Sequence, residues 1–167
     1  MSGRTYSVTG TNAGSRVGGI IADLEGHRDS KANLSKCVNF GNLTSISTHP
    51  NKNLLYPSWC GGIVGDMGPY LRIENCYNAS TELNAISRNS EQEGQPYIGR
   101  ICGYLLNEID EILSNNYSLT TTTLNGSIPT EDIGPDQKNG GSMTKAEIEK
   151  AIQELGFELP GELPAAS

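Results

Sequence analysis

The sequence predicts a mainly β protein: a short right-handed parallel β-helix (β-solenoid) of about three coils, followed by one C-terminal α-helix. The first observation is an apolar, glycine-containing string that occurs as VGGIIAD at Val17–Asp23, CGGIVGD at Cys60–Asp66 and IGRICGY at Ile98–Tyr104. The second is the interval of about 40 residues between its copies, which is typical of stacked repeats. The third is the composition, because 20 glycines and only 6% aromatic residues favour a thin core.

Two further strings complete the repeated unit. One reads LSKCVN at Leu34–Asn39, IENCYN at Ile73–Asn78 and LSNNYS at Leu113–Ser118, and the other begins at Leu43, Leu83 and Leu124. Each string is short, rich in β-branched and aromatic residues, and bounded by turn residues, so we expect three strands in each unit. Such a unit cannot bury its apolar side alone, which predicts stacking into a parallel ladder. The rule for parallel crossovers predicts the right-handed sense.

Alternation along the first string predicts which side chains face the core. The isoleucine shared by all copies, at Ile20, Ile63 and Ile101, is placed inward. The preceding position holds Gly19, Gly62 and Arg100. It is placed outward, because an arginine inside a thin core would need a partner.

This assignment leaves a row of apolar residues on the outer side of the sheet: Val17, Ile21, Cys60, Val64, Ile98 and Cys102. An outward apolar row needs a cover. Candidate covers are the segments Ser47–Trp59 and Ser87–Tyr97 and the C-terminal helix. A β-bulge that reverses the alternation is the alternative.

The clearest local prediction is the C-terminal helix. Thr144 and Glu147 form a capping box, and Gly156 supplies the stop, so the helix is expected from Lys145 to Leu155. It is a candidate to cap the last coil, since open solenoid ends need caps. The chain is therefore divided into a repeat solenoid at 1–143, with units starting near residues 17, 60 and 98, the helix at 144–156 and an extended tail at 157–167.

Charge and hydropathy exclude several classes of function. The formal net charge of −7 argues against nucleic acid and anionic membrane surfaces as partners. No apolar run reaches the roughly 18 residues of a membrane span. The N-terminus lacks the apolar core of a signal peptide, so we expect a cytosolic protein or a chain that begins after a removed signal.

The four cysteines lack the spacing of zinc or redox motifs. Cys60 and Cys102 align with Val and Ile in the other units, which is typical of cysteines that act as small hydrophobic residues. Cys37 and Cys76 occupy the same position of successive units, where stacked backbones would lie about 5 Å apart, within disulfide reach. Buried thiols are favoured, and a Cys37–Cys76 disulfide is the alternative.

Common catalytic and nucleotide-binding motifs are absent from the sequence, so no catalytic, cofactor-binding or metal-binding residue is assigned. Asp23 and Asp66 align, and turn capping is preferred over calcium binding for them. Together with Glu74, they are the acids that a carbohydrate-active β-helix would use. His27 and His49 are expected in solvated loops.

Two further sets of residues have predicted roles. Tyr56, Trp59 and Tyr97 are the candidate ligand-contact residues, because aromatic rings with a polar tip suit recognition surfaces. Covering the sheet is the preferred interpretation of these rings. Asn39 and Asn78 form a column with Ser118, which we expect to hydrogen-bond along the stack.

The string GGIVG at Gly61–Gly65, followed by IENCYN at Ile73–Asn78, resembles the GLUG-type repeats of bacterial surface proteins, including non-catalytic regions of IgA-specific metallopeptidases. The first unit carries the resemblance more weakly, and the third departs from it at Arg100 and Asn116. The segment NGGSMTKAEI at Asn139–Ile148 is similar to the segment that follows the last such repeat in proteins of gut Bacteroidetes. The resemblance implies a secreted or surface-attached β-solenoid and supplies no catalytic residues.

We therefore expect a non-enzymatic structural or adhesive repeat module of a secreted or cell-surface bacterial protein, with no cofactor. The alternative is a carbohydrate-binding or carbohydrate-active β-helix, a lyase or hydrolase. Expected partners are a host protein or glycan and the flanking domains of a longer parent chain. Three coils form a stack only about 15 Å tall, so self-association through the solenoid ends is also expected.

Overall fold

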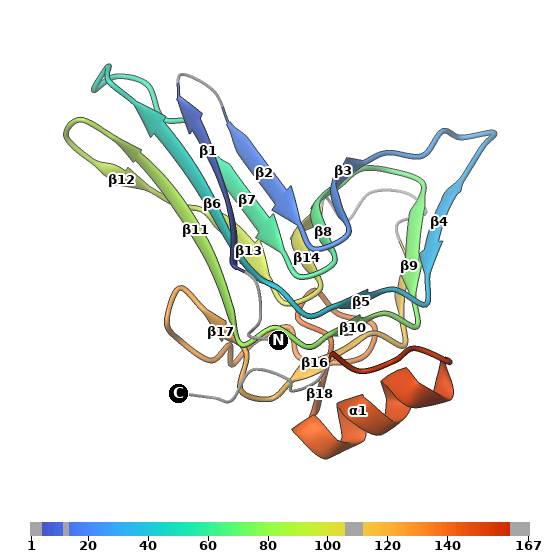
Figure 1. Ribbon diagram of the computed structural model, residues 1–167. Helices are drawn as coiled ribbons and strands as arrows, with labels where there is room; N and C mark the ends of the chain where they lie inside the picture. The colour runs from blue at the N-terminus through green and yellow to red at the C-terminus, as the bar shows by residue number, and fades with distance from the viewer. Residues whose placement is uncertain (1–4, 12–13, 106–111, 161–167) are drawn as a thin grey trace.

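A computed structural model of the chain describes residues 5–11, 14–105 and 112–160. Within these ranges the structure is mainly β, with eighteen strands and one helix. The strands form five sheets, and their pairing is parallel apart from the antiparallel pair β11–β12. We number the sheets 1 to 5 in the order in which the chain first enters them (Figure 1).

Sheet 1 contains β1 (Thr5–Thr11), β6 (Asn42–His49), β11 (Glu82–Asn89), β12 (Glu93–Gly94) and β17 (Thr123–Leu124). Sheet 2 contains β2 (Ser15–Gly18), β7 (Ser58–Gly61) and β13 (Tyr97–Gly99). Sheet 3 contains β3 (Ile21–Leu24), β8 (Val64–Met67) and β14 (Cys102–Leu105). Sheet 4 contains β4 (Ala32–Ser35), β9 (Leu71–Glu74) and β15 (Ile112–Ser114). Sheet 5 contains β5 (Val38–Asn39), β10 (Tyr77–Asn78), β16 (Tyr117–Leu119) and β18 (Gly141–Met143).

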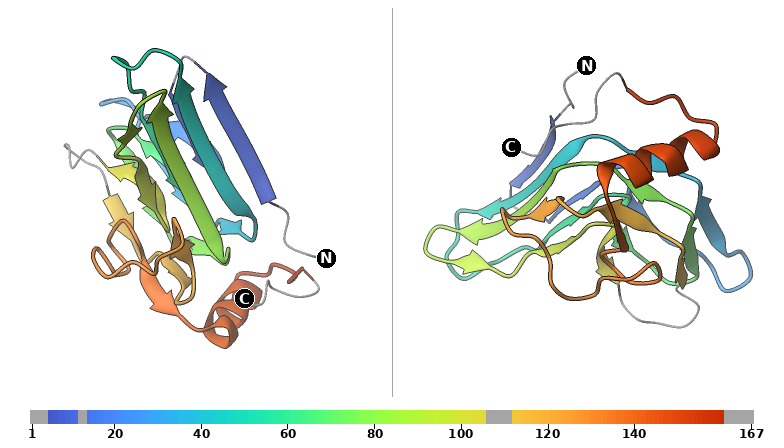
Figure 2. Two further views of the ribbon diagram at one scale, coloured as in Figure 1. Left: turned by 90° about the vertical axis from the view of Figure 1, so that its left-hand side faces the viewer. Right: turned by 90° about the horizontal axis from the view of Figure 1, so that it is seen from below.

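The chain visits the five sheets in the same order three times. Residues 5–39, 42–78 and 82–119 each contribute one strand to every sheet, except that the third stretch adds the short strand β12 to sheet 1, and we call these stretches the first, second and third pass. Strands of successive passes lie side by side (Figure 2). Val17 pairs with Cys60, and Cys60 with Ile98, which confirms the alignment predicted from the strings. Stacked parallel sheets of this kind are consistent with a β-solenoid.

The first and second passes contain five strands each and the third contains six, although the strings predicted three. The first string contains two strands, because β2 ends at Gly18, β3 begins at Ile21, and the chain turns between them. The second string is likewise divided between β4 and β5. At that turn Lys36, Asn75 and Asn115 have φ of 54°, 54° and 55°, a left-handed conformation that sharpens the corner.

The corner in the first string makes the predicted alternation wrong. Val17 and Cys60, predicted to face outward, are buried between sheets 1 and 2 together with Leu43, Leu83 and Ala85. On the other side of the corner, Val64 and Cys102 join Ile63 and Ile101 in a core between sheets 3 and 4. The turn restarts the alternation, so apolar residues on both sides of it face inward. In the described residues these positions therefore form core, and the proposed outer apolar row does not exist.

Glycine is required at this corner because two backbones meet there. A Cβ added to Gly61 would lie 1.8 Å from the carbonyl oxygen of Val64 and 2.6 Å from the amide nitrogen of Gly103. A Cβ added to Gly62 would lie 2.1 Å from the carbonyl oxygen of Arg100 and against the side chain of Asn78. The repeated glycines thus allow sheets 2 and 3 to approach closely, and the Gly62 position faces the interior.

Arg100 occupies the same string position as Gly62, which faces the interior. The prediction that Arg100 faces outward is therefore wrong. Arg100 is fully buried, and its guanidinium donates hydrogen bonds to the carbonyl of Leu119 at the end of the third pass and to two carbonyls and one hydroxyl of the segment that follows it. These acceptors satisfy the buried charge without a carboxylate. Burial lowers the pKa of Arg100 from its ordinary value.

The predicted column of amides is confirmed. Nδ2 of Asn39 donates to Oδ1 of Asn78 over 2.9 Å, and Nδ2 of Asn78 donates to Oγ of Ser118 over 3.1 Å. All three residues are buried. The column joins the three passes inside the stack, and its bonds satisfy polar groups that would be costly to bury unpaired.

The predicted helix is confirmed as α1 (Lys145–Glu154), with the capping box between Thr144 and Glu147. Ile148 and Ile152 are buried against Tyr77, Ala79 and Leu119, which lie on the outer face of sheet 5. The helix therefore covers sheet 5 and not the first string (Figures 1 and 2). Most of the predicted extended tail lies outside the described residues.

The other two predicted covers also lie elsewhere. The segment 47–59 joins β6 to β7, and the segment 87–97 contains β12, which pairs with the end of β11 at the edge of sheet 1 (Figure 1). Leu54 and Leu55 remain exposed in that loop.

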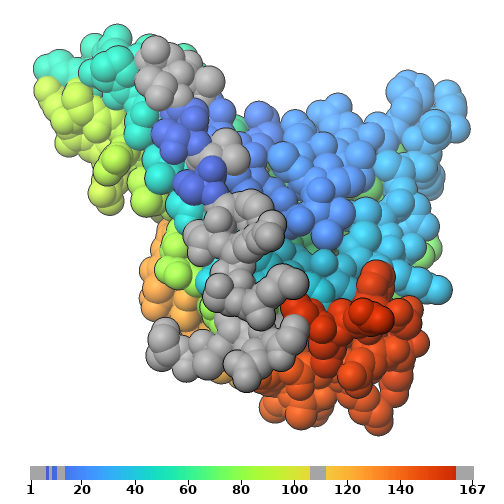
Figure 3. Space-filling view, in the orientation of Figure 1, coloured from blue at the N-terminus to red at the C-terminus, as the bar shows by residue number. Residues whose placement is uncertain are grey.

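The two ends of the stack differ in how well the core is covered. Ile63 and Ile101 are fully buried as predicted, whereas Ile20 in the first pass is 41% exposed. At the other end, the carbonyl oxygen of Lys138 accepts hydrogen bonds from the amides of Ile101 and Cys102. Residues 132–143 therefore cover the third pass, while first-pass residues form much of the surface seen in Figure 3.

Candidate functional site: an outer strip across sheets 2 and 3

The outer face of sheet 2 carries one column of large side chains. Arg16, Trp59 and Tyr97 are paired in register on β2, β7 and β13. The guanidinium carbon of Arg16 lies 4.1 Å from the centroid of the Trp59 ring, which is a cation–π contact. On its other side the Trp59 ring stacks on Tyr97, with centroids 5.9 Å apart and planes inclined by 19°. The stack thus uses both faces of the indole.

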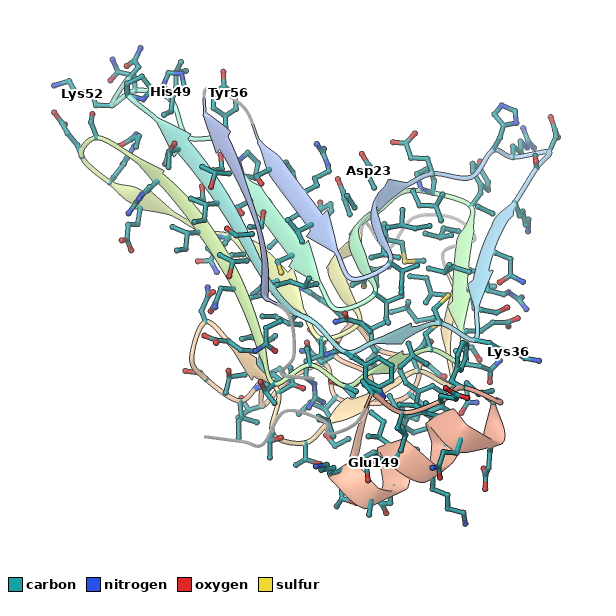
Figure 4. The ribbon with its side chains drawn as sticks, in the orientation of Figure 1. Asp23, Lys36, His49, Lys52, Tyr56 and Glu149 are labelled. Atoms are coloured by element: carbon teal, nitrogen blue, oxygen red, sulfur yellow. The ribbon has the colours of Figure 1, made fainter. Side chains whose placement is uncertain are left out.

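The outer face of sheet 3 carries a second column, made of Asp23, Asp66 and Tyr104. Nε of Arg16 donates to Oδ2 of Asp66 over 2.8 Å and lies 3.4 Å from Oδ2 of Asp23. The rings of Tyr97 and Tyr104 are in tilted contact, with centroids 4.5 Å apart. These contacts join the two columns across the angle between sheets 2 and 3, and we call the six residues the outer strip. In Figure 4, Asp23 lies between the strands of sheet 2 and those of sheet 4.

The outer strip offers groups suited to recognition. The side chains of Arg16 and Asp23 are 38% and 46% exposed, so charged groups of both signs reach solvent. The indole Nε1 of Trp59 is buried and has no hydrogen-bond partner within the described part of the chain. Ring edges, carboxylates and a guanidinium are groups that bind hydroxyl and amide groups of a ligand.

A pocket of about 490 Å3 opens beside the outer strip at the first-pass end of the stack. Arg16 contributes to its rim, and Val17, Asn39 and Leu43 are core residues that line it. The pocket is therefore the open end of the core and not an independent cavity.

The sequence prediction named Tyr56, Trp59 and Tyr97 as candidate contact residues, and the structure places two of them together. Trp59 and Tyr97 stack in the outer strip, whereas Tyr56 contacts the ring of His49 near the far end of sheet 1. Arg16 and Tyr104 were missed. Arg16 holds the same string position as Trp59 and Tyr97, so the alignment itself was a signal that could have found it.

The acids named for the carbohydrate-active alternative are not all brought together. Asp23 and Asp66 share the guanidinium of Arg16, so the pair is arranged for charge neutralisation. Glu74 lies on sheet 4, where it pairs with Arg72 at 3.5 Å. The exposed ring of His27 accepts a bond from the amide of Asp29, in the loop between β3 and β4.

The buried cysteines are poorly suited to nucleophilic chemistry. Burial raises the pKa of Cys60 to about 12 and that of Cys76 to about 12. Both thiols are therefore protonated at neutral pH, and the thiolate is the reactive form. No disulfide joins the four cysteines, all of which belong to the described residues.

The structure describes residues 5–11, 14–105 and 112–160. No cluster of three or more His, Cys, Asp or Glu side chains able to hold a metal ion occurs there. No helix in these ranges is long and apolar enough to cross a membrane.

Comparison of the chain with protein-family models, with curated proteins and with solved structures gave no match.

Proposed function

We propose that the chain is a non-enzymatic structural or adhesive repeat module of a secreted or cell-surface bacterial protein, with the outer strip as its contact surface. One observation carries the proposal. The positions that hold the same residue in all three strings are the glycine corner at Gly18, Gly61 and Gly99 and the isoleucine column, in which Ile63 and Ile101 are fully buried. Neither column of the outer strip holds one residue type in all three units. Stacking thus accounts for the repeated residues, which leaves recognition to the others.

The proposal includes a finer description of the fold. The three passes are the coils of a right-handed β-solenoid, because parallel strands joined by crossovers follow that sense in nearly all known cases. The resemblance of Gly61–Gly65 and Ile73–Asn78 to GLUG-type repeats supports the same architecture and an extracellular location.

The ligand class that best fits the outer strip is a glycan or protein of the host. Aromatic rings beside paired charges match a hydroxyl-rich partner. A carbohydrate-binding module is the second candidate function for this reason. A carbohydrate-active enzyme has less support, because Glu74 is on another sheet and the two aspartates are engaged by Arg16.

The first-pass end of the stack is a candidate contact for the expected flanking partners. Leu24, Ala32 and Leu34 are only partly buried, although their second-pass neighbours Met67, Leu71 and Ile73 are fully buried. A further coil of the same pattern, from a flanking domain or a second copy, would complete this core. The exposed edge strands would accept it, since unpaired backbone groups favour strand addition.

A binding screen tests the adhesive role. The purified chain is applied to arrays of bacterial and mammalian glycans and of extracellular host proteins, and binding is compared with that of Trp59→Ala and Asp23→Asn. We expect at least one class of probe to bind, and both variants to bind it about ten-fold or more weakly, as is usual for truncation of a central contact residue.

Arg72→Ala is the matched control, because Arg72 is an exposed charged residue on sheet 4, away from the outer strip. It should bind like the unaltered chain, and thermal unfolding should show that all variants are folded. Binding that survives both strip variants would contradict the proposed surface. Cleavage of a bound polysaccharide, measured as new reducing ends or unsaturated products, would contradict the non-enzymatic assignment.

A further inference from the structure

Cys37 and Cys76 lie in register on neighbouring passes. Each immediately precedes the sheet 5 strand of its pass, and the following residues, Val38 and Tyr77, are paired. The amide of Tyr77 donates to the carbonyl oxygen of Cys37 over 2.9 Å. Neighbouring parallel strands are about 4.8 Å apart, and disulfides join residues whose Cα atoms are about 4.4–6.8 Å apart. The backbone spacing is thus compatible with a bridge.

The side chains of the two cysteines also face the same core. The residues before them, Lys36 and Asn75, share a left-handed φ of 54°, so both chains turn in the same way and direct both side chains toward the core. Sγ of Cys76 lies 3.8 Å from the carbonyl oxygen of Leu34, in the pass of Cys37, so the Cys76 side chain reaches toward the first pass. Sγ of Cys37 also approaches the carbonyl of Ser35, and Sγ of Cys76 approaches that of Glu74. The pair is therefore preorganised by the backbone.

Access to the pair is uneven. Cys37 belongs to the less covered first pass and is partly exposed, whereas Cys76 is fully buried. An oxidant from solvent therefore reaches Cys37 first. Cys60 pairs with Val17 and Ile98, and Cys102 pairs with Val64, so neither has a cysteine as its neighbour along the stack.

We propose that Cys37 and Cys76 are an oxidation site, where a small disulfide of the glutathione type converts the two thiols into a covalent link between the first and second passes. The Cys37 thiolate attacks the small disulfide and releases one small thiol, which leaves a mixed disulfide. The Cys76 thiolate then attacks Sγ of Cys37 and releases the second small thiol. The protein loses two electrons and two protons, and the small disulfide is reduced to two thiols.

The rate of this reaction depends on whether the protein is folded. Burial raises the pKa of both thiols, so the thiolate needed for each step is scarce in the folded chain. During folding the same thiols are solvated and more reactive. We expect the link to form mainly as the chain folds in an oxidising compartment. We also expect it to stabilise the first pass, which is the less covered end of the stack.

Refolding under two redox conditions tests the site. The unaltered chain is refolded with a mixture of oxidised and reduced glutathione, or with a phosphine reductant, and digested under non-reducing conditions for mass spectrometry. We expect one cross-linked peptide pair, Cys37 to Cys76, with the loss of two hydrogens. Because the link closes a loop of about 40 residues, the oxidised chain should have a Tm about 5–10 °C higher.

Two variants separate this site from general oxidation. Cys37→Ser should lose both the cross-link and the rise in Tm, while Cys60→Ser should keep both. A cross-link that contains Cys60 or Cys102, glutathione that stays attached to Cys37, or four thiols after oxidative refolding would each overturn the proposal. The peptide map of the unaltered chain gives this answer even if a variant fails to fold.

Discussion

Replacing Gly61 by alanine is expected to destabilise the protein by at least about 4 kcal/mol, or to prevent folding. The added methyl group would lie 1.8 Å from the carbonyl oxygen of Val64, and its next neighbours are the backbone atoms of Gly103 and Val64. Backbone at a buried corner cannot move aside as a flexible side chain can. Urea unfolding followed by circular dichroism measures the change.

Gly134→Ala is the matched control for this substitution. A methyl group there would meet only the side chain of Gln137, at 3.1 Å, and that side chain can shift. We expect a change within about 0.5 kcal/mol of the unaltered chain. Equal, small effects of the two substitutions would show that sheets 2 and 3 do not meet at the glycine corner as described.

Replacing Arg100 by methionine is expected to destabilise the protein by about 3 kcal/mol. The guanidinium donates to the carbonyl oxygens of Asn139 at 2.9 Å, Leu119 at 3.1 Å and Gly140 at 3.3 Å, and to Oγ of Ser142 at 3.1 Å. Methionine fills similar space but donates to none of these acceptors, of which the Leu119 carbonyl keeps the amide of Thr122 as a donor. Removing a buried charge also removes its desolvation cost, so the net effect is smaller than the sum of the lost bonds.

Two further substitutions test whether the planar set of donors of Arg100 is responsible for this loss of stability. Arg100→Lys keeps the charge but not the planar set of donors, so an intermediate loss is expected. Arg88→Met removes an arginine that is exposed on sheet 1 and should change the free energy of unfolding by less than about 0.5 kcal/mol. A loss for Arg100→Met as small as that for Arg88→Met would contradict the role of Arg100 in covering the third pass.

Much of the stacking could be predicted from sequence, because parallel in-register stacking makes equivalent residues into spatial neighbours. The pairing of Val17, Cys60 and Ile98 follows directly from aligning the strings, as does the column of Asn39, Asn78 and Ser118. The helix was predictable for a different reason, since the capping box and the stop at Gly156 are local signals.

The faces of the first string could not be predicted from alternation alone. Alternation holds within a strand, but Gly18 and Gly19 allow a corner that separates β2 from β3, and a corner restarts the pattern. The burial of Arg100 was missed because its acceptors belong to residues 119 and 139–142, a relation between distant segments that no local pattern encodes.

The two columns of the outer strip could be predicted from the sequence, but the contacts between them could not. The aromatic character of Trp59 and Tyr97 drew attention to them, and the alignment placed Arg16 in their column and Tyr104 with Asp23 and Asp66. The repeated strings do not predict the angle between sheets 2 and 3. That angle brings the two columns into contact through Arg16 with Asp66 and through Tyr97 with Tyr104.

The central claim, that successive passes stack in parallel and in register, is tested most directly by nuclear Overhauser effects in the labelled protein. The amide of Ile20 bonds to the carbonyl of Ile63 at 3.0 Å, and the amide of Ile63 to that of Ile101 at 2.9 Å. We predict cross-peaks between backbone protons of residues about 40 positions apart at these sites and along β6–β11. Cross-peaks that instead join residues 17–24 to residues 32–39 as an antiparallel hairpin would contradict the account.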